Sequence, residues 1–237
     1  MTGRGTVPAM PRTARAVEAG LVYHVLNRGN GRMRLFHKDE DFSAFERVLG
    51  QGLERYSVDL FTYCLMGNHW HLVVRPRTED ALGRFMGWVG VTHVRRHHQH
   101  YHTRGGGHLY QGRFKCFPVQ DDTHFLTVCR YVEANALRAG LVKRAERWMW
   151  GGLNARGYRG KPFTLANWPV EQARGWTAAV NEALADKALE RIRTSVNRGR
   201  PCGEQPWVQR TAERLGLTFT LRNPGRPRKP PEEAINQ

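Results

Sequence analysis

The sequence predicts an α+β fold built on a ferredoxin-like sheet, the split β-α-β plan, with helices on one face of the sheet. Runs of strand formers alternate with longer segments of helical period in the order β-α-β-β-α-β. The two middle strands are separated only by Gly67-Asn68, which is typical of a tight turn. The fourth strand contains Pro118, a residue tolerated near the edge of a sheet.

The first strand and the first helix are predicted over residues 21–56. Residues 21–27 are rich in strand formers and end at the turn-forming residues 28–31. From residue 39 to residue 56, apolar side chains recur at helical spacing, and acidic residues occupy the first turn, where they complement the helix dipole. We therefore expect a strand, a loop and a helix in this order.

The hairpin at residues 61–75 contains the pattern His69-Trp70-His71. Successive side chains of a strand point to opposite faces, so both histidines share one face and Trp70 points into a core. Two neutral imidazoles side by side supply half of a divalent-metal site. His-X-His on a strand is a weak motif by itself, and the alternative is a pair of surface histidines on a half-buried sheet.

A second helix is predicted over residues 82–101 and a fourth strand over residues 110–120. The helical period turns several apolar residues and His93 inward. Between Asp80 and Asp121 the sequence has no acidic residue, whereas arginines and histidines are frequent. This imbalance favours a binding surface for polyanions over a merely solvated basic face.

A third helix is predicted from an N-cap at Asp122 or Thr123 to Ala139, closed by Gly140. Its positions i, i+4 and i+7 are Tyr131, Asn135 and Arg138, which share one strip of the helix surface. A hydroxyl, a neutral oxygen ligand and a guanidinium on one strip form a set of reactive groups. The alternative is that the tyrosine is a packing residue with a wet hydroxyl.

The net charge of +16 and the pI near 10.5 predict attraction to polyanions, and nucleic acid is the expected partner. The four cysteines form no Cys-X-X-Cys pair, which argues against a zinc ribbon or a disulfide framework. We identify no signal peptide and no apolar run of about 20 residues. The expected location is the cytoplasm, in association with the nucleoid.

Four regions are predicted along the chain. Residues 1–19 form a flexible arm, residues 20–150 the catalytic domain, residues 151–196 a helical extension and residues 197–237 a basic DNA-binding tail. The extension should contain a helix over residues 171–194, and the tail a short helix over residues 206–215. Arg-Pro segments flank the short helix and are typical of minor-groove contacts, although a disordered basic tail is an equal alternative.

Four segments together resemble the successive motifs of the REP-associated tyrosine transposases, single-tyrosine members of the HUH (His-hydrophobic-His) superfamily in the IS200-like transposase family. The resemblance covers residues 11–150. The segments are Asn27-Arg-Gly-Asn30, Tyr63-Cys-Leu-Met-Gly-Asn-His-Trp-His-Leu72, Gln111-Gly-Arg-Phe-Lys115 and Arg130-Tyr-Val-Glu-Ala-Asn-Ala-Leu-Arg-Ala-Gly-Leu-Val142.

The resemblance implies that Tyr131 is the nucleophile and that His69, His71 and Asn135 bind a divalent metal, Mg²⁺ or Mn²⁺. Two departures are the bulky Trp70 between the histidines and Ala136, where the family commonly has proline. Neither removes a chemical group. The implied partner is single-stranded DNA with a REP-like hairpin, bound by a monomer or a homodimer.

The implied activity is metal-dependent nicking and strand transfer of single-stranded DNA through a 5′-phosphotyrosine intermediate. The sequence identifies no general base for the phenol, and Glu133 falls on another side of the helix. One alternative is a catalytically silent DNA-binding regulatory protein of the same fold. Another is a metal-dependent hydrolase that uses water in place of the tyrosine.

Ten basic residues are candidates for DNA contacts, which position the strand through its phosphates. Sequence reading would depend on base stacking by exposed aromatics such as Tyr110 or Phe114, although a core role is favoured for each of them. The ten are Arg84, Arg95, Arg96, Arg113, Lys115, Arg138, Arg198, Arg200, Arg226 and Arg228.

Overall fold

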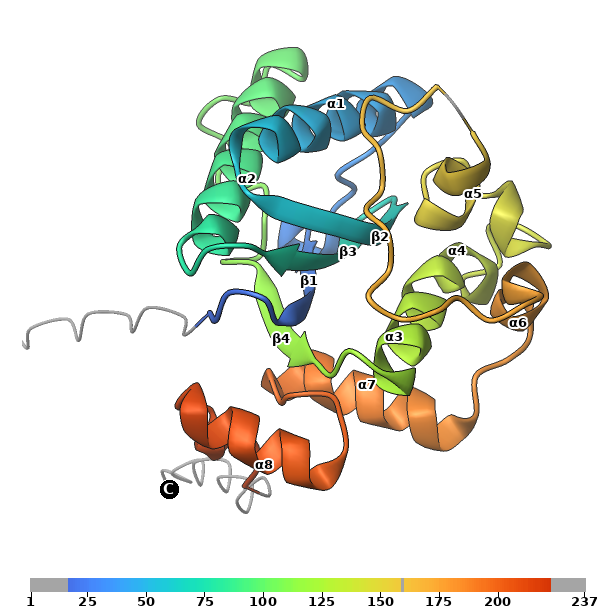
Figure 1. Cartoon of the computed structure of the whole chain (residues 1–237). Coiled ribbons are helices and arrows are strands. Elements are labelled where there is room, and N and C mark those ends of the chain that lie inside the picture. The colour runs from blue at the N-terminus through green and yellow to red at the C-terminus, as the bar shows by residue number, and fades with distance from the viewer. Residues whose placement is uncertain (1–16, 159, 223–237) are drawn as a thin grey trace, which may run out of the picture.

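A computed structural model of the 237-residue chain describes residues 17–158 and 160–222. At its centre is a four-stranded antiparallel sheet in the order β2-β3-β1-β4 (Figure 1). This order, with a helix after β1 and another after β3, confirms the predicted ferredoxin-like plan. The strands are β1 (Val22–Arg28), β2 (Val58–Met66), β3 (His69–Pro76) and β4 (Lys115–Val119). Most of the predicted arm, residues 1–16, lies outside the described residues.

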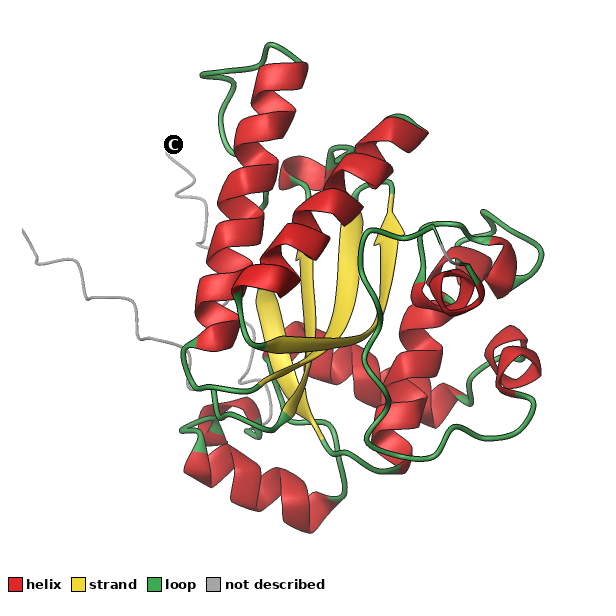
Figure 2. Ribbon diagram, turned by 45° about the horizontal axis from the view of Figure 1, so that its top comes forward, coloured by secondary structure: helices red, strands yellow, loops and turns green. Residues whose placement is uncertain are grey.

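Two long helices, α1 (Asp39–Arg55) and α2 (Ala81–His100), cover one face of the sheet (Figure 2). The alternation of β3 turns Trp70 toward them, and its side chain is 1% exposed, as predicted. The indole Nε1 donates to the Tyr110 hydroxyl at 3.0 Å, and that hydroxyl lies 2.7 Å from Nδ1 of His93. Tyr110 and His93 are therefore core residues on this side of the sheet.

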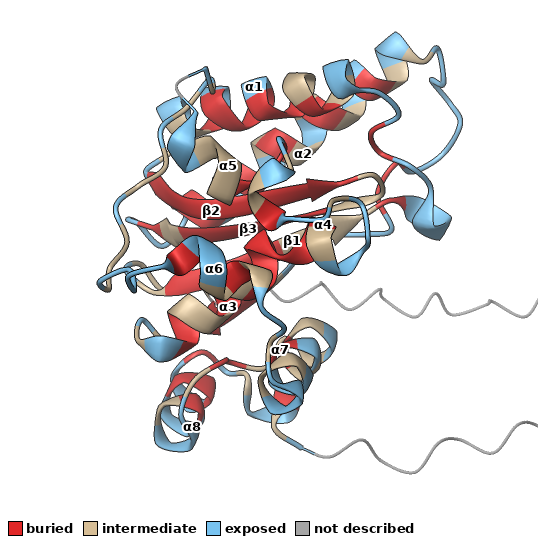
Figure 3. Ribbon diagram, turned by 90° about the vertical axis from the view of Figure 1, so that its right-hand side faces the viewer, coloured by how far each residue is buried: buried red, intermediate tan, exposed pale blue. Residues whose placement is uncertain are grey.

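A third helix, α3 (Thr123–Glu133), covers the opposite face and is followed by the short helix α4 (Asn135–Arg138) (Figure 3). Asp122 is the N-cap and accepts a hydrogen bond from the backbone nitrogen of His124 at 2.8 Å. The predicted single helix is interrupted at Ala134. The backbone nitrogen of Arg138 nevertheless donates a hydrogen bond to the carbonyl oxygen of Ala134, which continues the helical hydrogen-bond pattern. Because helices cover both faces, β2 is buried along its whole length.

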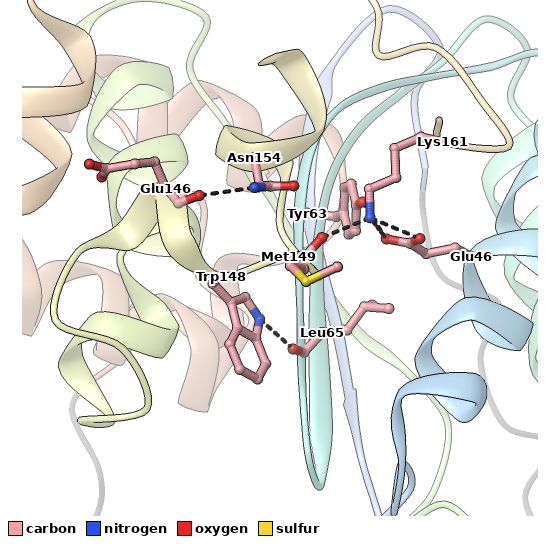
Figure 4. Close-up of polar contacts among 8 residues, drawn as sticks. All are labelled: Glu46, Tyr63, Leu65, Glu146, Trp148, Met149, Asn154 and Lys161. Atoms are coloured by element: carbon pink, nitrogen blue, oxygen red, sulfur yellow. Dashed lines mark hydrogen bonds and ion pairs between the residues drawn. The ribbon is translucent and has the colours of Figure 1, made fainter. Parts of the chain in front are cut away.

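The outer edge of β2 is covered by the segment that follows α4, which contains η2 (Ala145–Arg147) and α5 (Gly152–Gly157). Lys161 Nζ lies 2.7 Å from a carboxylate oxygen of Glu46 and donates to the Met149 carbonyl, while the Tyr63 hydroxyl donates to the same carboxylate (Figure 4). The Trp148 indole also donates to the Leu65 carbonyl. The backbone nitrogen of Leu65 donates to the Trp150 carbonyl and that of Ala166 donates to the Leu60 carbonyl, so this segment protects an edge that would otherwise be open to pairing with another chain.

The helix predicted over residues 171–194 is two helices, α6 (Trp176–Asn181) and α7 (Asp186–Arg198). Trp176 Nε1 donates to Glu133 on α3, whereas α7 extends to β4. The Arg130 guanidinium donates hydrogen bonds to the carbonyls of Glu182 and Ala183, which lie between the two helices. It thereby satisfies carbonyl groups that have no partner within a helix.

The predicted short helix is confirmed as α8 (Gln205–Arg214), and two 3₁₀ segments are η1 (Asn30–Arg32) and η3 (Thr218–Thr220). Before α8, the backbone nitrogen of Cys202 donates to the Pro118 carbonyl, and that of Gln120 donates to the Cys202 carbonyl. This segment therefore covers the outer edge of β4. All four cysteines lie in the described part of the chain, and no disulfide joins them. No helix in the described part of the chain is long and apolar enough to cross a membrane.

Candidate active site

The pairing of β1 with β3 brings a basic and imidazole-rich surface together beneath α3. Leu26 lies opposite His71, and Arg28 lies opposite His69. Since alternate residues share a face, His24 joins Leu26 and Arg28 on the side of the histidine pair. The ring centroids of His69 and His71 are 5.1 Å apart. The shared face predicted for these two histidines is confirmed.

Both imidazoles of the pair use Nδ1 for a hydrogen bond inside the protein. His69 Nδ1 lies 2.6 Å from Oδ1 of Asn68, and His71 Nδ1 lies 2.9 Å from Nε2 of His24. The Nε2 atoms of the pair have no hydrogen-bond partner within residues 17–158 and 160–222. These two nitrogens are the ones that remain for a ligand.

Burial keeps the histidines of this site neutral. It lowers the pKa of His69 to about 4, assisted by the nearby charges of Arg28 and Arg138. Burial also lowers the pKa of His71 well below its ordinary value, with His24 as the next contributor, and lowers that of His24 to about 3. Neutral imidazoles are the form that binds metal ions.

The strip predicted on the third helix is present and faces the histidines. The ring centroid of Tyr131 lies 6.0 Å from that of His71 within the same chain, and the Tyr131 side chain is 9% exposed. The Arg138 guanidinium carbon lies 3.9 Å from the Tyr131 ring centroid, and its Nη2 donates to Oδ1 of Asn135 at 2.9 Å. Tyrosine, amide and guanidinium therefore form one contiguous group beside the histidine pair.

The donor set fits a divalent ion that accepts two nitrogens and one oxygen. Asn135 Oδ1 is an sp² oxygen with two lone pairs, so it can accept from Arg138 and still bind a cation. Asn135 Nδ2 is buried and has no partner among the described residues. In the same part of the chain, no group of three or more His, Cys, Asp and Glu side chains is arranged to hold a metal. The fit therefore depends on the amide as third ligand.

A basic cavity of about 310 Å³ adjoins this face at the ends of β1 and β4. Arg28, Arg113 and Lys115 line it, and Gln111 and Asn197 add two amides. Among the described residues, no ion pair involves any of the three cations. Three positive charges without a carboxylate partner make this cavity attractive to a phosphate group.

The other predicted DNA contacts are dispersed over the molecule. Arg84, Arg95 and Arg96 project from α2, on the other face of the sheet, and Arg84 is paired with Asp80 at 3.1 Å. Arg200 lines a cavity between α7 and α8. Arg198 ends α7, and Arg226 and Arg228 lie outside the described residues.

Two residues of this face, His24 and Arg28, were not predicted from the sequence. Both lie within segments that it identified, but their proximity to the histidine pair depends on the register between β1 and β3. Glu133 is excluded from the site, because its carboxylate accepts bonds from Thr62 and from Trp176 in the interior. Phe114 lines a cavity on the other side of β1 with Trp70 and Tyr110.

A structure of a REP-associated tyrosine transposase bound to a REP hairpin is 14% identical, with a TM-score of 0.49 over 69% of this chain and 100% of that chain. A crystal structure from Deinococcus radiodurans R1, assigned as a transposase, is 18% identical, with a TM-score of 0.37 over 56% of this chain and 95% of that one. No curated protein matches.

The family model for IS200-like transposases matches residues 18–135. This range contains β1, the hairpin with its two histidines, and α3 with Tyr131, and it ends at Asn135. The resemblance given by the four motifs is thereby confirmed at the level of the family. The chain belongs to the family of IS200-like transposases.

Proposed function

We propose that the protein is a metal-dependent endonuclease and strand transferase of single-stranded DNA that acts through a covalent bond to Tyr131. The observation that carries the proposal is the position of the Tyr131 ring, 6.0 Å from the ring of His71 in the same chain. A tyrosine nucleophile, two unengaged imidazole nitrogens and an amide are grouped on one face, as this reaction needs.

Tyr131 would attack the scissile phosphorus through its phenolic oxygen. A phosphorus–oxygen bond to the tyrosine forms, the bond to the 3′-oxygen breaks, the phenolic proton leaves and the 3′-oxygen gains one. Because the phosphodiester is retained as a 5′-phosphotyrosine, the reverse reaction can join strands without another energy source. Arg138, whose guanidinium lies over the Tyr131 ring, would favour the phenolate that forms when the proton leaves.

The expected cofactor is Mg²⁺ or Mn²⁺, held by His69, His71 and Asn135. When bound, such an ion supplies positive charge to the scissile phosphate as its negative charge grows. The protein contributes neutral imidazoles whose Nδ1 atoms are already fixed by Asn68 and His24, so Nε2 is presented in a defined direction.

The DNA partner is proposed to be a strand with a REP-like hairpin, as the four sequence motifs imply. Its backbone would pass along the basic cavity of Arg28, Arg113 and Lys115, which lies beside the histidine pair. Phosphate contacts at this place position the strand but do not read its bases. The proposed location of such a protein is the cytoplasm, on the chromosome.

The experiment is to incubate the protein with labelled hairpin-bearing single-stranded DNA and Mn²⁺ or EDTA, followed by a denaturing protein gel. The wild type and Tyr158→Phe, which alters an exposed tyrosine, should give a covalent protein–DNA band with Mn²⁺ only. Tyr131→Phe should give none. DNA cleavage by Tyr131→Phe would instead indicate a hydrolase, and tight binding without cleavage by the wild type would indicate the silent DNA-binding protein.

A further inference from the structure

His24 is a fully buried histidine in contact with the proposed metal pair. Its side chain is 0% exposed, its Nε2 lies 2.9 Å from Nδ1 of His71, and its ring meets Phe117 at right angles with centroids 4.9 Å apart. Its other nitrogen, Nδ1, is buried without a partner within residues 17–158 and 160–222. An imidazole with one unsatisfied nitrogen is unfavourable in a core, so an apolar residue would pack here at lower cost.

The contact between His24 and His71 brings Nε2 of His24 next to Nδ1 of His71. Because both rings are neutral, one of these two nitrogens carries a proton and donates it to the other. If the proton belongs to Nδ1 of His71, then Nε2 of His71 keeps its lone pair and can bind a metal. If the proton belongs to Nε2 of His24, then His71 carries its own proton on Nε2 and cannot bind. Ligation through Nδ1 of His71 is blocked, because His24 occupies that side.

We propose that His24 is a positioning residue that accepts a hydrogen bond from Nδ1 of His71 and thereby holds His71 in its metal-binding tautomer. The inference rests on the proposed metal-dependent function and adds a residue to it. His69 has the corresponding arrangement, because its Nδ1 lies 2.6 Å from Oδ1 of Asn68. Each histidine of the pair thus has a partner for Nδ1 that leaves Nε2 directed at the ligand.

An imidazole suits this position better than the carboxylate that often supports a metal-binding histidine. A carboxylate at His24 would place a charge in a site that is closed to solvent and flanked by Phe117, which is strongly unfavourable. A neutral imidazole offers a nitrogen acceptor without a charge. The ring proton of His24 is then on Nδ1, which stays buried without an acceptor among the described residues.

Two measurements on the full chain without DNA test this role. Nitrogen-15 NMR of the histidine rings with bound Zn²⁺, a diamagnetic probe, locates the ring protons. We expect a proton on Nδ1 of His71 and a scalar coupling between that nitrogen and Nε2 of His24. Mn²⁺ titration, followed by electron paramagnetic resonance, gives the affinity of the site in wild type and variants.

His24→Leu should weaken Mn²⁺ binding by about 10- to 100-fold, the usual effect of losing such a supporting partner. The free protein should then carry the His71 proton on Nε2. His24→Gln, which returns a neutral acceptor, should recover most of the affinity. Phe117→Leu is the matched control, because it changes the packing around His24 but no hydrogen bond, and should retain the wild-type affinity.

Three outcomes would overturn the inference. A proton on Nε2 of His24 in the Zn²⁺-bound protein would contradict it even if no variant folded. Equal Mn²⁺ affinity of wild type and folded His24→Leu would contradict the role of His24 alone and leave the proposed function intact. Failure of wild type to bind Mn²⁺ or Zn²⁺ would refute the inference together with the metal-dependent function.

Discussion

The guanidinium of Arg138 lies over the aromatic ring of Tyr131, with its central carbon 3.9 Å from the ring centroid. The same guanidinium donates to Oδ1 of Asn135, so one cation connects the proposed nucleophile to the proposed third metal ligand. Burial lowers the pKa of Arg138, while the contact with Tyr131 raises it. The charge therefore remains at neutral pH, in a partly buried place where it acts strongly on its neighbours.

Arg138→Gln should lower the rate of covalent adduct formation by about 100-fold, comparable to the loss of one transition-state donor. The reason is that Tyr131 loses the cation that lies over its ring and favours the phenolate form of the nucleophile. Single-turnover kinetics on a hairpin-bearing strand measure this rate. Arg55→Gln removes an exposed arginine of α1 and should react at the wild-type rate. Equal rates for both variants would show that Arg138 has only a packing role.

Arg28→Gln should weaken binding of single-stranded DNA and reduce the steepness of its salt dependence. One phosphate contact contributes about 0.7 to the slope of log affinity against log salt for a single strand. Arg28 lines the basic cavity beside His69, so the slope should fall by this amount, whereas Arg55→Gln should keep it. Fluorescence anisotropy at several salt concentrations gives both slopes. An unchanged slope in Arg28→Gln would place the DNA elsewhere.

Lys161→Met should destabilise the fold by about 3 kcal/mol, because it leaves the buried carboxylate of Glu46 without its cation. Tyr63 still donates to Glu46 but carries no charge. The free energy of unfolding in urea measures the change. Lys143→Met replaces an exposed lysine and should stay within about 0.5 kcal/mol of wild type. A loss of the same small size in Lys161→Met would show that the ion pair is dispensable.

The free energy of unfolding should decrease as the pH is lowered from about 6.5 to about 3, in part because of His93. Burial lowers the pKa of His93 to about 3, so in this window the unfolded chain binds a proton that the folded chain does not. This histidine alone contributes a slope of about 1.4 kcal/mol per pH unit, positive with increasing pH. His93→Gln keeps an acceptor for the Tyr110 hydroxyl. Thermal and urea unfolding at several pH values should show a smaller slope in His93→Gln than in a control that alters exposed His108.

Local periodicity was enough to predict much of the site. The alternation of a strand placed His69 and His71 on one face, and the helical period placed Tyr131, Asn135 and Arg138 on one strip. The element order also predicted the sheet. The interruption at Ala134 left the strip intact, because the backbone bonds continue across it.

What the sequence did not reveal depends on contacts between distant segments. His24 supports His71 only because β1 and β3 pair in one particular register, which no local pattern specifies. The same register brings Arg28 to His69. The helix expected over residues 171–194 is divided: α6 packs on α3, whereas α7 packs on both α3 and β4. Tertiary packing therefore determines both the surroundings of the histidine pair and the division of this helix.

Mass spectrometry of the protein–DNA adduct shows whether Tyr131 is the residue that becomes joined to DNA. Trypsin cleavage after Arg130 and after Arg138 isolates the peptide 131–138, which contains a single tyrosine. After reaction with Mn²⁺ and hairpin-bearing DNA followed by nuclease digestion, this peptide should carry a nucleotide 5′-phosphate on Tyr131, and it should carry none with EDTA. A nucleotide on another peptide, or cleaved DNA with a free 5′-phosphate and no adduct, would contradict the covalent role of Tyr131.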